Sequence, residues 1–305
     1  MVAERERSVG VTGAVGLSID SDLVRGLVAG QFPQWRELPV VPVAQQGWDN
    51  RTYRLGNDLT VRLPSAAGYV AAIEKENDCL PLLAPHLPQA IPVPVATGEP
   101  TADYPFPWSI RRWLPGDILH AAARLDLPTL ATDLGAFLVR LRAAPTTGGP
   151  AAGRHSFFRG CAPVVYADEV KEALAALSSR VDVPACERVW DAAVASQWAG
   201  DPVWFHGDIA TGNLLARNGR LSAVIDFGTC GIGDPACDLV IAWTLFTGDT
   251  RALFRRSVGL PGDAWARARG WALWKALITL AWSPQSAQRT EARRVIDEVL
   301  ADPLA

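Results

Sequence analysis

The spacing of apolar residues changes near residue 114 and divides the sequence into two parts. Before that point, short apolar runs alternate with polar residues, as at 59–63, and this is typical of β-strands with one buried face. After it, apolar residues recur every three or four positions, as at 127–144, which predicts amphipathic helices. The pattern predicts an α+β chain with two lobes: a small N-lobe built on an antiparallel sheet and a larger, mainly helical C-lobe.

In the first part, capping residues and apolar spacing predict helices at 18–32 and 71–83. Strands are predicted at 38–44, 52–55, 59–63, 92–98 and 108–114. The breaker cluster Pro115-Gly116-Asp117 follows the last strand and suits a boundary between lobes. Residues 1–15 are expected to be loosely ordered.

In the second part, helices are predicted at 127–144, 170–177, 186–198, 236–246, 265–282 and 290–300. The segment 146–160 is rich in Gly, Ala and Pro without periodicity, and we expect a mobile connection there. The tryptophans at 265, 271, 274 and 282 are expected to belong to the core rather than to an aromatic substrate box.

Composition narrows the class of protein. With 305 residues, 49% of them hydrophobic, the chain can bury one large core or two. A net charge of −3 does not favour a nucleic-acid partner. Five cysteines without regular spacing favour free thiols in a reducing cytoplasm. No signal peptide is recognised, and no apolar run reaches the roughly eighteen residues of a membrane span. We expect a soluble cytoplasmic protein without a membrane partner.

Polar side chains are concentrated between residues 203 and 238. A strand at 203–205 is predicted to deliver His206 and Asp208 into a loop. The pair Asn218-Gly219, between two apolar runs, is a strong hairpin signal. That hairpin would bring Asn213, at the start of one strand, beside Asp226, at the end of the next, with Asp208 nearby.

These residue types suit phosphoryl transfer. Asn213 and Asp226 offer the oxygen ligands that Mg²⁺ prefers. Asp208 is not needed for the metal, and it would orient and deprotonate a hydroxyl group as general base. The spacing Asp208-x4-Asn213, then a hairpin, then Asp226-Phe227-Gly228, is the arrangement of a kinase catalytic loop and its metal-binding aspartate.

The segments HGDIATGNLL and VIDFGTCGIGDPACDL resemble the aminoglycoside phosphotransferase family, small-molecule antibiotic kinases with a protein-kinase-like fold. HGD stands where protein kinases have HRD, and the trailing GDPxxDL is typical of this branch. The resemblance implies a nucleotide-binding N-lobe at 1–113, a hinge near 109–114, and a helical C-lobe at 114–305 with the catalytic loop and substrate site.

By this resemblance, Arg62 stands where the family has a phosphate-contacting lysine, and arginine keeps the positive charge. A helix glutamate would pair with it, Glu76 or, as an alternative, Glu74. The tip carrying Gly47 and Asn50 would fold over the nucleotide phosphates. A surface arginine, a solvated helix face and an ordinary hairpin are the alternatives to these roles.

The hinge backbone near Ile110 and Arg112 would hold adenine. The resemblance gives His206 the role of a brace beneath the catalytic loop, rather than of a proton carrier. Asp234 and Asp238 would fix the loop after Asp226 through hydrogen bonds and helix capping. A zinc site from Cys230, Cys237 and His206 fits by residue type only, because a short cysteine pair and a fourth ligand are missing.

The predicted function is transfer of the γ-phosphoryl group of ATP or GTP, with Mg²⁺, to a hydroxyl of a small molecule. The resemblance suggests an aminoglycoside or related cationic antibiotic, hence a resistance or self-protection enzyme. A metabolic amino alcohol or sugar is an alternative substrate. A pseudokinase disabled at Arg62 is another alternative, although Asp208, Asn213 and Asp226 are all present. A protein substrate is disfavoured, because GTCGIGDPACDL leaves no room for a long peptide-docking segment.

Overall fold

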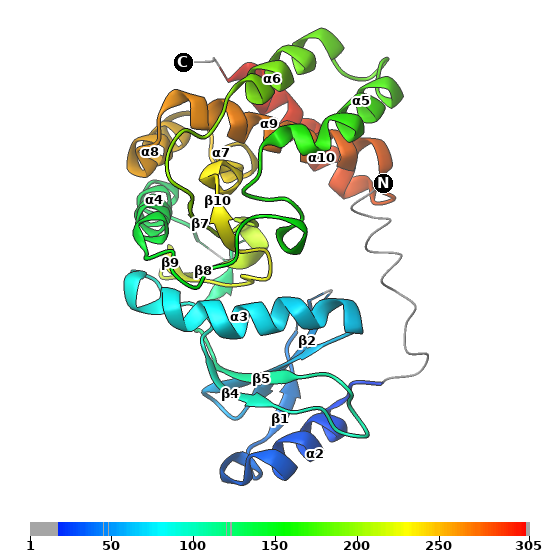
Figure 1. Cartoon of the computed structure of the whole chain (residues 1–305), viewed down its shortest axis with the longest axis vertical. Coiled ribbons are helices and arrows are strands. Elements are labelled where there is room, and N and C mark those ends of the chain that lie inside the picture. Colours follow the sequence, from blue (N-terminus) through cyan, green and yellow to red (C-terminus); the bar gives the residue numbers. More distant parts are fainter. Residues whose placement is uncertain (1–17, 45, 48, 120, 123, 303–305) are drawn as a thin grey trace. The chain divides into compact units, whose positions relative to one another are not determined.

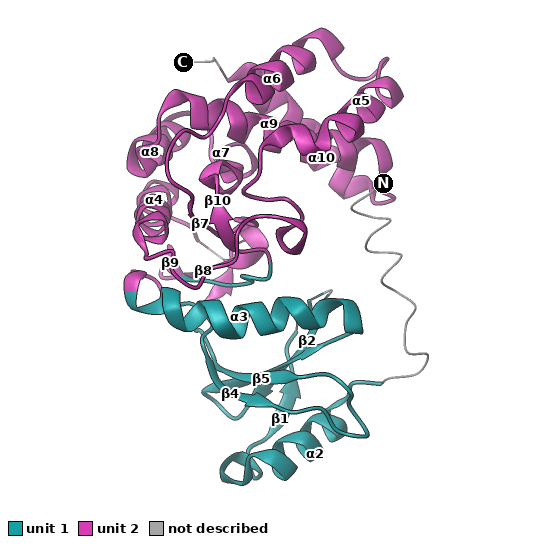
Figure 2. Ribbon diagram, in the orientation of Figure 1, with its two compact units in different colours: residues 1–85, 90–115, 223–228 teal, residues 86–89, 116–222, 229–305 magenta. Residues whose placement is uncertain are grey.

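The computed structural model describes residues 18–302 except Gln45, Trp48, His120 and Ala123, so the expectation for residues 1–15 falls outside the described residues. The chain forms two compact units (Figure 2). Unit 1 is Met1–Pro85, Ala90–Pro115 and Ala223–Gly228, and unit 2 is His86–Gln89, Gly116–Ser222 and Thr229–Ala305.

Unit 1 is built on a five-stranded antiparallel sheet in the order β1-β2-β3-β5-β4 (Figure 1). Its strands are β1 (Val40–Pro42), β2 (Asn50–Leu55), β3 (Leu59–Pro64), β4 (Pro94–Gly98) and β5 (Trp108–Arg112). Its helices are α2 (Ser21–Gln31) and α3 (Val70–Leu83), which lie on opposite sides of the sheet.

The side-chain alternation of β3 and β5 gives the sheet two different faces. Val61 and Ile110 are paired across the strands and face a core that α2 covers. Their neighbours Arg62 and Arg111 must therefore point to the opposite face, toward α3. This second face therefore carries Arg62 and Arg111, both of which lie near Glu76 of α3.

Unit 2 is mainly helical. Its helices are α4 (Leu127–Ala143), α5 (Ala167–Ala176), α6 (Val183–Ala195), α7 (Ile241–Thr244), α8 (Gly248–Val258), α9 (Gly262–Trp282) and α10 (Ser286–Ala301). Its short strands are β6 (Asp117–Ile118), β7 (Val203–Phe205), β8 (Leu214–Arg217), β10 (Gly231–Gly233) and the first part of β9 (Arg220–Val224). β6, β8 and β9 form one small sheet, and β7 pairs with β10. Helix α9 packs against α5, α6 and α10 and is buried over most of its length.

Most predicted elements are present, and the predicted hairpin around Asn218 and Gly219 is β8–β9. The predicted helix 236–246 is instead a 3-10 helix, Pro235–Leu239, followed by the four-residue α7. Helix α8 escaped prediction because it buries a charged residue, Arg251, with only two apolar ones. Trp265, Trp271 and Trp274 are in the core, as expected.

The prediction of a mobile connection at 146–160 is wrong. Pro150 and Ala152 form backbone hydrogen bonds with Ile232 of β10, and the carbonyl oxygen of Gly160 accepts one from Asp234. A Cβ atom on Gly160 would lie 2.1 Å from the ring of Phe205. The small residues therefore let this backbone pack closely against β7 and β10, instead of loosening it.

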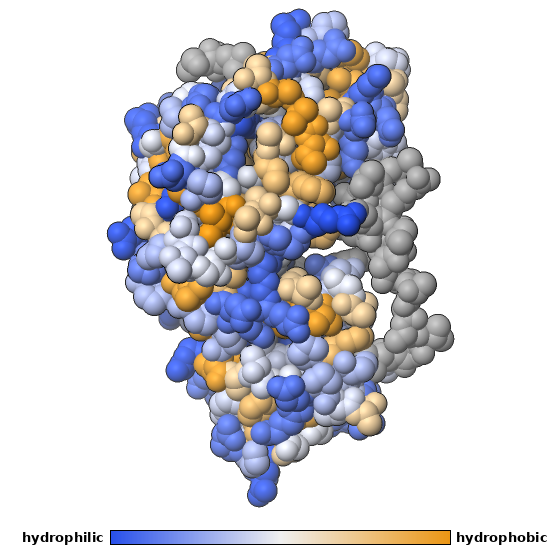
Figure 3. Space-filling model, viewed as in Figure 1, coloured by the Kyte–Doolittle hydropathy of each residue, from blue (hydrophilic) through white to orange (hydrophobic). Residues whose placement is uncertain are grey.

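On the face shown in Figure 3, hydrophobic residues form small groups among hydrophilic ones. Large hydrophobic side chains that are exposed in the described chain are scattered: Val41, Leu82, Val95, Val139, Val164 and Val165. None of the described helices combines the length and hydrophobicity that crossing a membrane requires.

Candidate active site

The loop after β7 is held by the carboxylate of Asp238. Its two oxygens accept hydrogen bonds from the backbone N–H groups of His206 (2.8 Å) and Gly207 (2.7 Å). Gly207 has a φ of +86°, and a Cβ atom there would lie 2.8 Å from Oγ1 of Thr229. Burial raises the pKa of Asp238, while His206 and these N–H groups oppose the rise. The turn thus needs glycine and a buried carboxylate beneath it.

His206 is fully buried below the loop. Its Nδ1 accepts a hydrogen bond of 3.1 Å from the backbone N–H of Asp208. Its carbonyl oxygen accepts a hydrogen bond of 2.9 Å from Oγ1 of Thr229. In these contacts, His206 holds the backbone on both sides of the loop.

Asp208 itself is exposed, at the end of this supported backbone. The side-chain N–H₂ of Asn213 donates to Oδ2 of Asp208 (2.8 Å) and to its carbonyl oxygen (2.9 Å). This interaction fixes the carboxylate of Asp208 through Oδ2 and leaves Oδ1 available to another partner. The structure thus brings His206, Asp208, Asn213 and Asp238 together in unit 2.

Asp234 ties the following segment to α9. Its Oδ2 lies 2.6 Å from Nε of Arg267, a residue with no exposed surface, and its Oδ1 accepts a hydrogen bond from Ala236 at the start of the 3-10 helix. Burial raises the pKa of Asp234, and the guanidinium of Arg267 opposes the rise. This is a buried ion pair that also caps a helix.

In unit 1, four predicted site residues lie together. Nη2 of Arg62 is 3.1 Å from Oδ1 of Asp226 and 3.6 Å from Oε2 of Glu76. With its side-chain oxygen turned toward Arg62, Asn50 accepts hydrogen bonds at 3.1 and 3.2 Å. Burial alone would lower the pKa of Arg62, but Glu76 and Asp226 raise it. Glu74 is exposed, so Glu76 is the glutamate that pairs with Arg62.

Asp226 has an unusual backbone. Its φ is +66°, in the left-handed region that non-glycine residues rarely occupy. Such strain is concentrated at functional sites, where the surrounding structure enforces it. Its side chain remains 46% exposed, so that one carboxylate oxygen can bind a partner from solution while the other contacts Arg62.

Sequence reasoning missed one member of this cluster, Arg111. Its Nη1 lies 3.0 Å from Oε2 of Glu76, whereas Nη2 of Arg62 lies 3.6 Å from the same oxygen. Only 1% of Arg111 is exposed. The strand register could have revealed it. Thr60 is paired with Arg111 and Arg62 with Ser109, so all four side chains share the face toward α3.

The other predicted nucleotide-binding residues lie elsewhere. Gly47 is in an exposed loop, where its carbonyl oxygen accepts a hydrogen bond from Arg51. Ile110 lies mid-strand between β3 and β4 with its side chain in the core, so that its backbone groups face neighbouring strands. The adenine-binding role of the backbone near Ile110 and Arg112 stays a prediction. Arg112, one residue later, is exposed.

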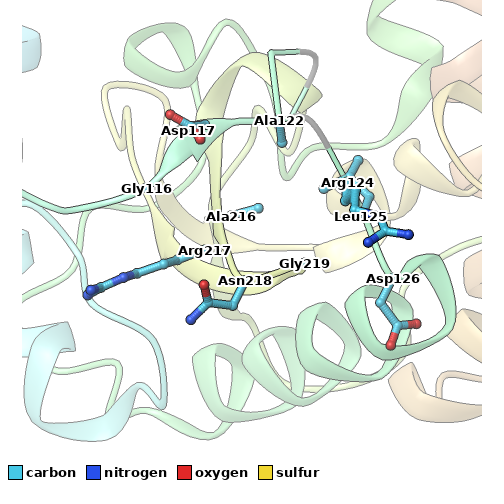
Figure 4. Close-up of a pocket in the computed structure, with 10 residues that line it drawn as sticks. All are labelled: Gly116, Asp117, Ala122, Arg124, Leu125, Asp126, Ala216, Arg217, Asn218 and Gly219. Carbon is cyan, nitrogen blue, oxygen red and sulfur yellow. The ribbon is translucent and has the colours of Figure 1, made fainter.

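A pocket of about 660 Å³ lies in unit 2, beside the β8–β9 turn (Figure 4). Its lining residues include Asp117, Arg124, Asp126, Arg217 and Asn218. None of the predicted site residues lines it. It is a separate surface feature, formed where the hairpin turn meets the start of α4.

Asp226 of unit 1 and Asn213 of unit 2 each carry a hard oxygen donor of the kind that magnesium prefers. In Asp226 it is a half-exposed carboxylate, and in Asn213 it is the amide oxygen, since the amide nitrogen is bound to Asp208. No cluster of three or more His, Cys, Asp or Glu side chains suited to a metal occurs in the described part of the chain. Magnesium does not need one, because it retains waters and substrate phosphates as ligands. By its chemistry, each residue taken by itself suits magnesium, and their joint role as ligands stays a prediction.

The whole sequence was then compared with known proteins. Residues 40–271 match the phosphotransferase enzyme family, APH. The chain belongs to this family. No curated protein matches the sequence. Family membership confirms the predicted resemblance, the kinase-like α+β fold and the assignment as a phosphotransferase.

Solved structures of the family share the fold at low sequence identity. Aminoglycoside 2′-phosphotransferase-IIIa with GDP is 19% identical, with a TM-score of 0.67 over 93% of this chain and 99% of that one. The macrolide 2′-phosphotransferase MphH from Brachybacterium faecium is 21% identical, with a TM-score of 0.61 over 90% and 98%. The streptomycin–ATP complex of APH(2″)-IIa is 16% identical, with a TM-score of 0.61 over 94% and 98%. At these identities, the comparison establishes the fold alone.

Proposed function

We propose that the protein transfers the γ-phosphoryl group of ATP or GTP to a hydroxyl of a small molecule, most directly an aminoglycoside or related cationic antibiotic. The observation that carries this proposal is the exposed carboxylate of Asp208, oriented by Asn213 on a backbone fixed by Asp238. Solved relatives supply further support, since they are described with GDP, ADP or ATP and with kanamycin, streptomycin or gentamicin.

In the proposed reaction, Oδ1 of Asp208 accepts the hydroxyl proton, because Oδ2 is engaged by Asn213. The substrate oxygen forms a bond to the γ-phosphorus as the bond to the β-phosphate oxygen breaks, and nucleoside diphosphate leaves. Since this transition state is loose, the position of Asp208 matters more than its basicity. The supported loop backbone provides that position.

The charged residues of unit 1 would serve the nucleotide. Arg62 would contact its phosphates, with Glu76 and Asn50 fixing the guanidinium. Magnesium bound by Asp226 and Asn213 would offset the charge of the phosphates. Unit 1 would then be the nucleotide-binding lobe and unit 2 the substrate lobe.

The cysteines support a cytoplasmic location. In the described part of the chain, none of the five is joined in a disulfide, and four of them are buried. Cysteines without disulfides suit a reducing cytoplasm.

The test is magnesium-dependent release of nucleoside diphosphate over a panel of aminoglycosides, macrolides, peptide antibiotics and amino alcohols. Release stimulated by one class identifies the acceptor, and Asp208→Asn should lower that rate by about 100-fold or more. Asp201→Asn, an exposed aspartate shortly before β7, is the matched control and should retain wild-type turnover.

Two results would contradict the proposal. Full turnover in Asp208→Asn would show that Asp208 is not the catalytic base. Tight binding of ATP or GTP, with no acceptor stimulation and no magnesium-dependent hydrolysis, would favour a pseudokinase.

A further inference from the structure

Unit 1 holds a carboxylate that is shared by two arginines. Glu76 has no exposed surface, and its Oε2 lies 3.0 Å from Nη1 of Arg111 and 3.6 Å from Nη2 of Arg62. A buried carboxylate requires a compensating cation, and one arginine at this distance suffices. The second arginine therefore needs another explanation.

The two arginines differ in their freedom. Arg111 is fixed on both sides of its guanidinium, because Nε donates to Oγ of Ser109 (3.0 Å) and Nη2 to Oδ1 of Asn77 (3.3 Å). Arg62 keeps 16% of its side chain exposed and also reaches Asp226, whose carboxylate is half exposed. Arg111 is thus a static partner of Glu76, whereas Arg62 lies at the edge of the cluster.

Two arginines face Glu76 and Asp226, and the charge of Asp49 also acts on Arg62. If Arg62 turns to the phosphates of a nucleotide, Glu76 remains neutralised by Arg111. Without Arg111, Arg62 would be the one arginine left in an ion pair with this buried carboxylate among the described residues. Moving it away would leave that charge uncompensated, which is strongly unfavourable.

We propose that Arg111 is a positioning residue for nucleotide binding: it neutralises Glu76 and so leaves Arg62 available to the phosphates. This inference rests on the proposed function, and within it assigns a role to a residue outside the predicted site. Burial lowers the pKa of Arg111, and the charge of Glu76 opposes this fall.

The experiment measures the dissociation constants of MgATP and MgGTP by calorimetry on the full chain. Arg111→Met keeps a flexible, unbranched side chain without the charge, and it should weaken nucleotide binding by about tenfold or more. The double variant Arg111→Met/Glu76→Gln removes both charges and frees Arg62 again. Its dissociation constant should be at least about threefold lower than that of Arg111→Met alone.

Thermal unfolding of the same samples separates this role from a structural one. A merely structural Arg111 would lower Tm in Arg111→Met but leave the dissociation constant of the folded protein unchanged, and that result overturns the inference. So does a double variant that binds no better than Arg111→Met. Arg36→Met, an exposed arginine of unit 1, is the matched control.

Nucleotide binding by the wild-type protein distinguishes failure of the proposed function from failure of the inference about Arg111. If it binds neither nucleotide, the proposed function fails and the inference fails with it. If wild type and Arg111→Met bind nucleotide equally, the inference alone is overturned.

Discussion

The side-chain amide of Asn213 donates a hydrogen bond of 2.8 Å to the carboxylate of Asp208. The residue expected to bind magnesium is thus also the one that orients the proposed base. Asn213→Ala should therefore lose both an oxygen ligand and the orientation of Asp208. Turnover of the acceptor identified by the panel should fall by about 100-fold or more.

Asn213→Asp separates the two roles of this residue. It retains an oxygen ligand but places a second carboxylate against Asp208, where like charges repel. Saturating Mg²⁺ should restore part of the turnover of Asn213→Asp. It should not restore the turnover of Asn213→Ala. Equal rates for the two variants at all magnesium concentrations would contradict a ligand role.

The buried pair Asp234–Arg267 should dominate the stability of unit 2. Arg267→Met leaves Asp234 buried without its cation and should lower the free energy of unfolding by about 3–5 kcal/mol. The double variant Asp234→Asn/Arg267→Met should recover most of this loss. Urea unfolding at constant pH measures both values, and additive losses would contradict the pairing.

The stability of Arg267→Met should also depend on pH. Burial already raises the pKa of Asp234, and removing the guanidinium raises it further above the value in the unfolded chain. The folded state then prefers the protonated carboxyl, so stability is lost as pH rises through the folded pKa. The deficit relative to wild type should be larger at about pH 8 than at about pH 5. An equal loss of stability at the two pH values would show that the uncompensated charge of Asp234 is not the cause of the loss.

Gly160 should tolerate no side chain. Its φ is +82°, and the Cβ of Gly160→Ala would meet the ring of Phe205, so the variant should lose about 2 kcal/mol or more of stability. Gly26→Ala is the control, because a Cβ there has no neighbour within 4 Å in helix α2. That variant should be neutral or slightly stabilised. Matching Tm values for the two variants would contradict close packing at 160.

The cysteines should differ in reactivity. Cys161 is partly exposed, whereas burial raises the pKa of Cys186 to about 11 and that of Cys237 well above its usual value. Since the thiolate is the reactive form, a thiol reagent at neutral pH should label Cys161 first in the folded protein. Mass spectrometry of digested protein measures this order. Early labelling of Cys237 would indicate local opening near the catalytic loop.

The sequence predicted what depends on local signals. The Asn218–Gly219 turn, the apolar spacing of α4 and the motif around Asp208 each identify their element without its neighbours. Arg111 could not be found in this way, because its role comes from strand register and from a helix 35 residues earlier in the chain. The prediction for segment 146–160 failed for a related reason. Glycine in a sequence indicates a flexible backbone, although here it permits close contact with β7 and β10. The adenine contacts remain predictions, since backbone groups leave little trace in side-chain identity.

The path of the chain between the units also limits how the protein can be dissected. Strand β9 starts in unit 2 and ends in unit 1, and the segment Ala223–Gly228 carries Asp226 into the cluster around Arg62. A fragment that stops at residue 115 would lack this carboxylate and the bridge between Ala223 and Ala90. A minimal module built on unit 1 would therefore have to include 223–228 as well as the residues up to 115.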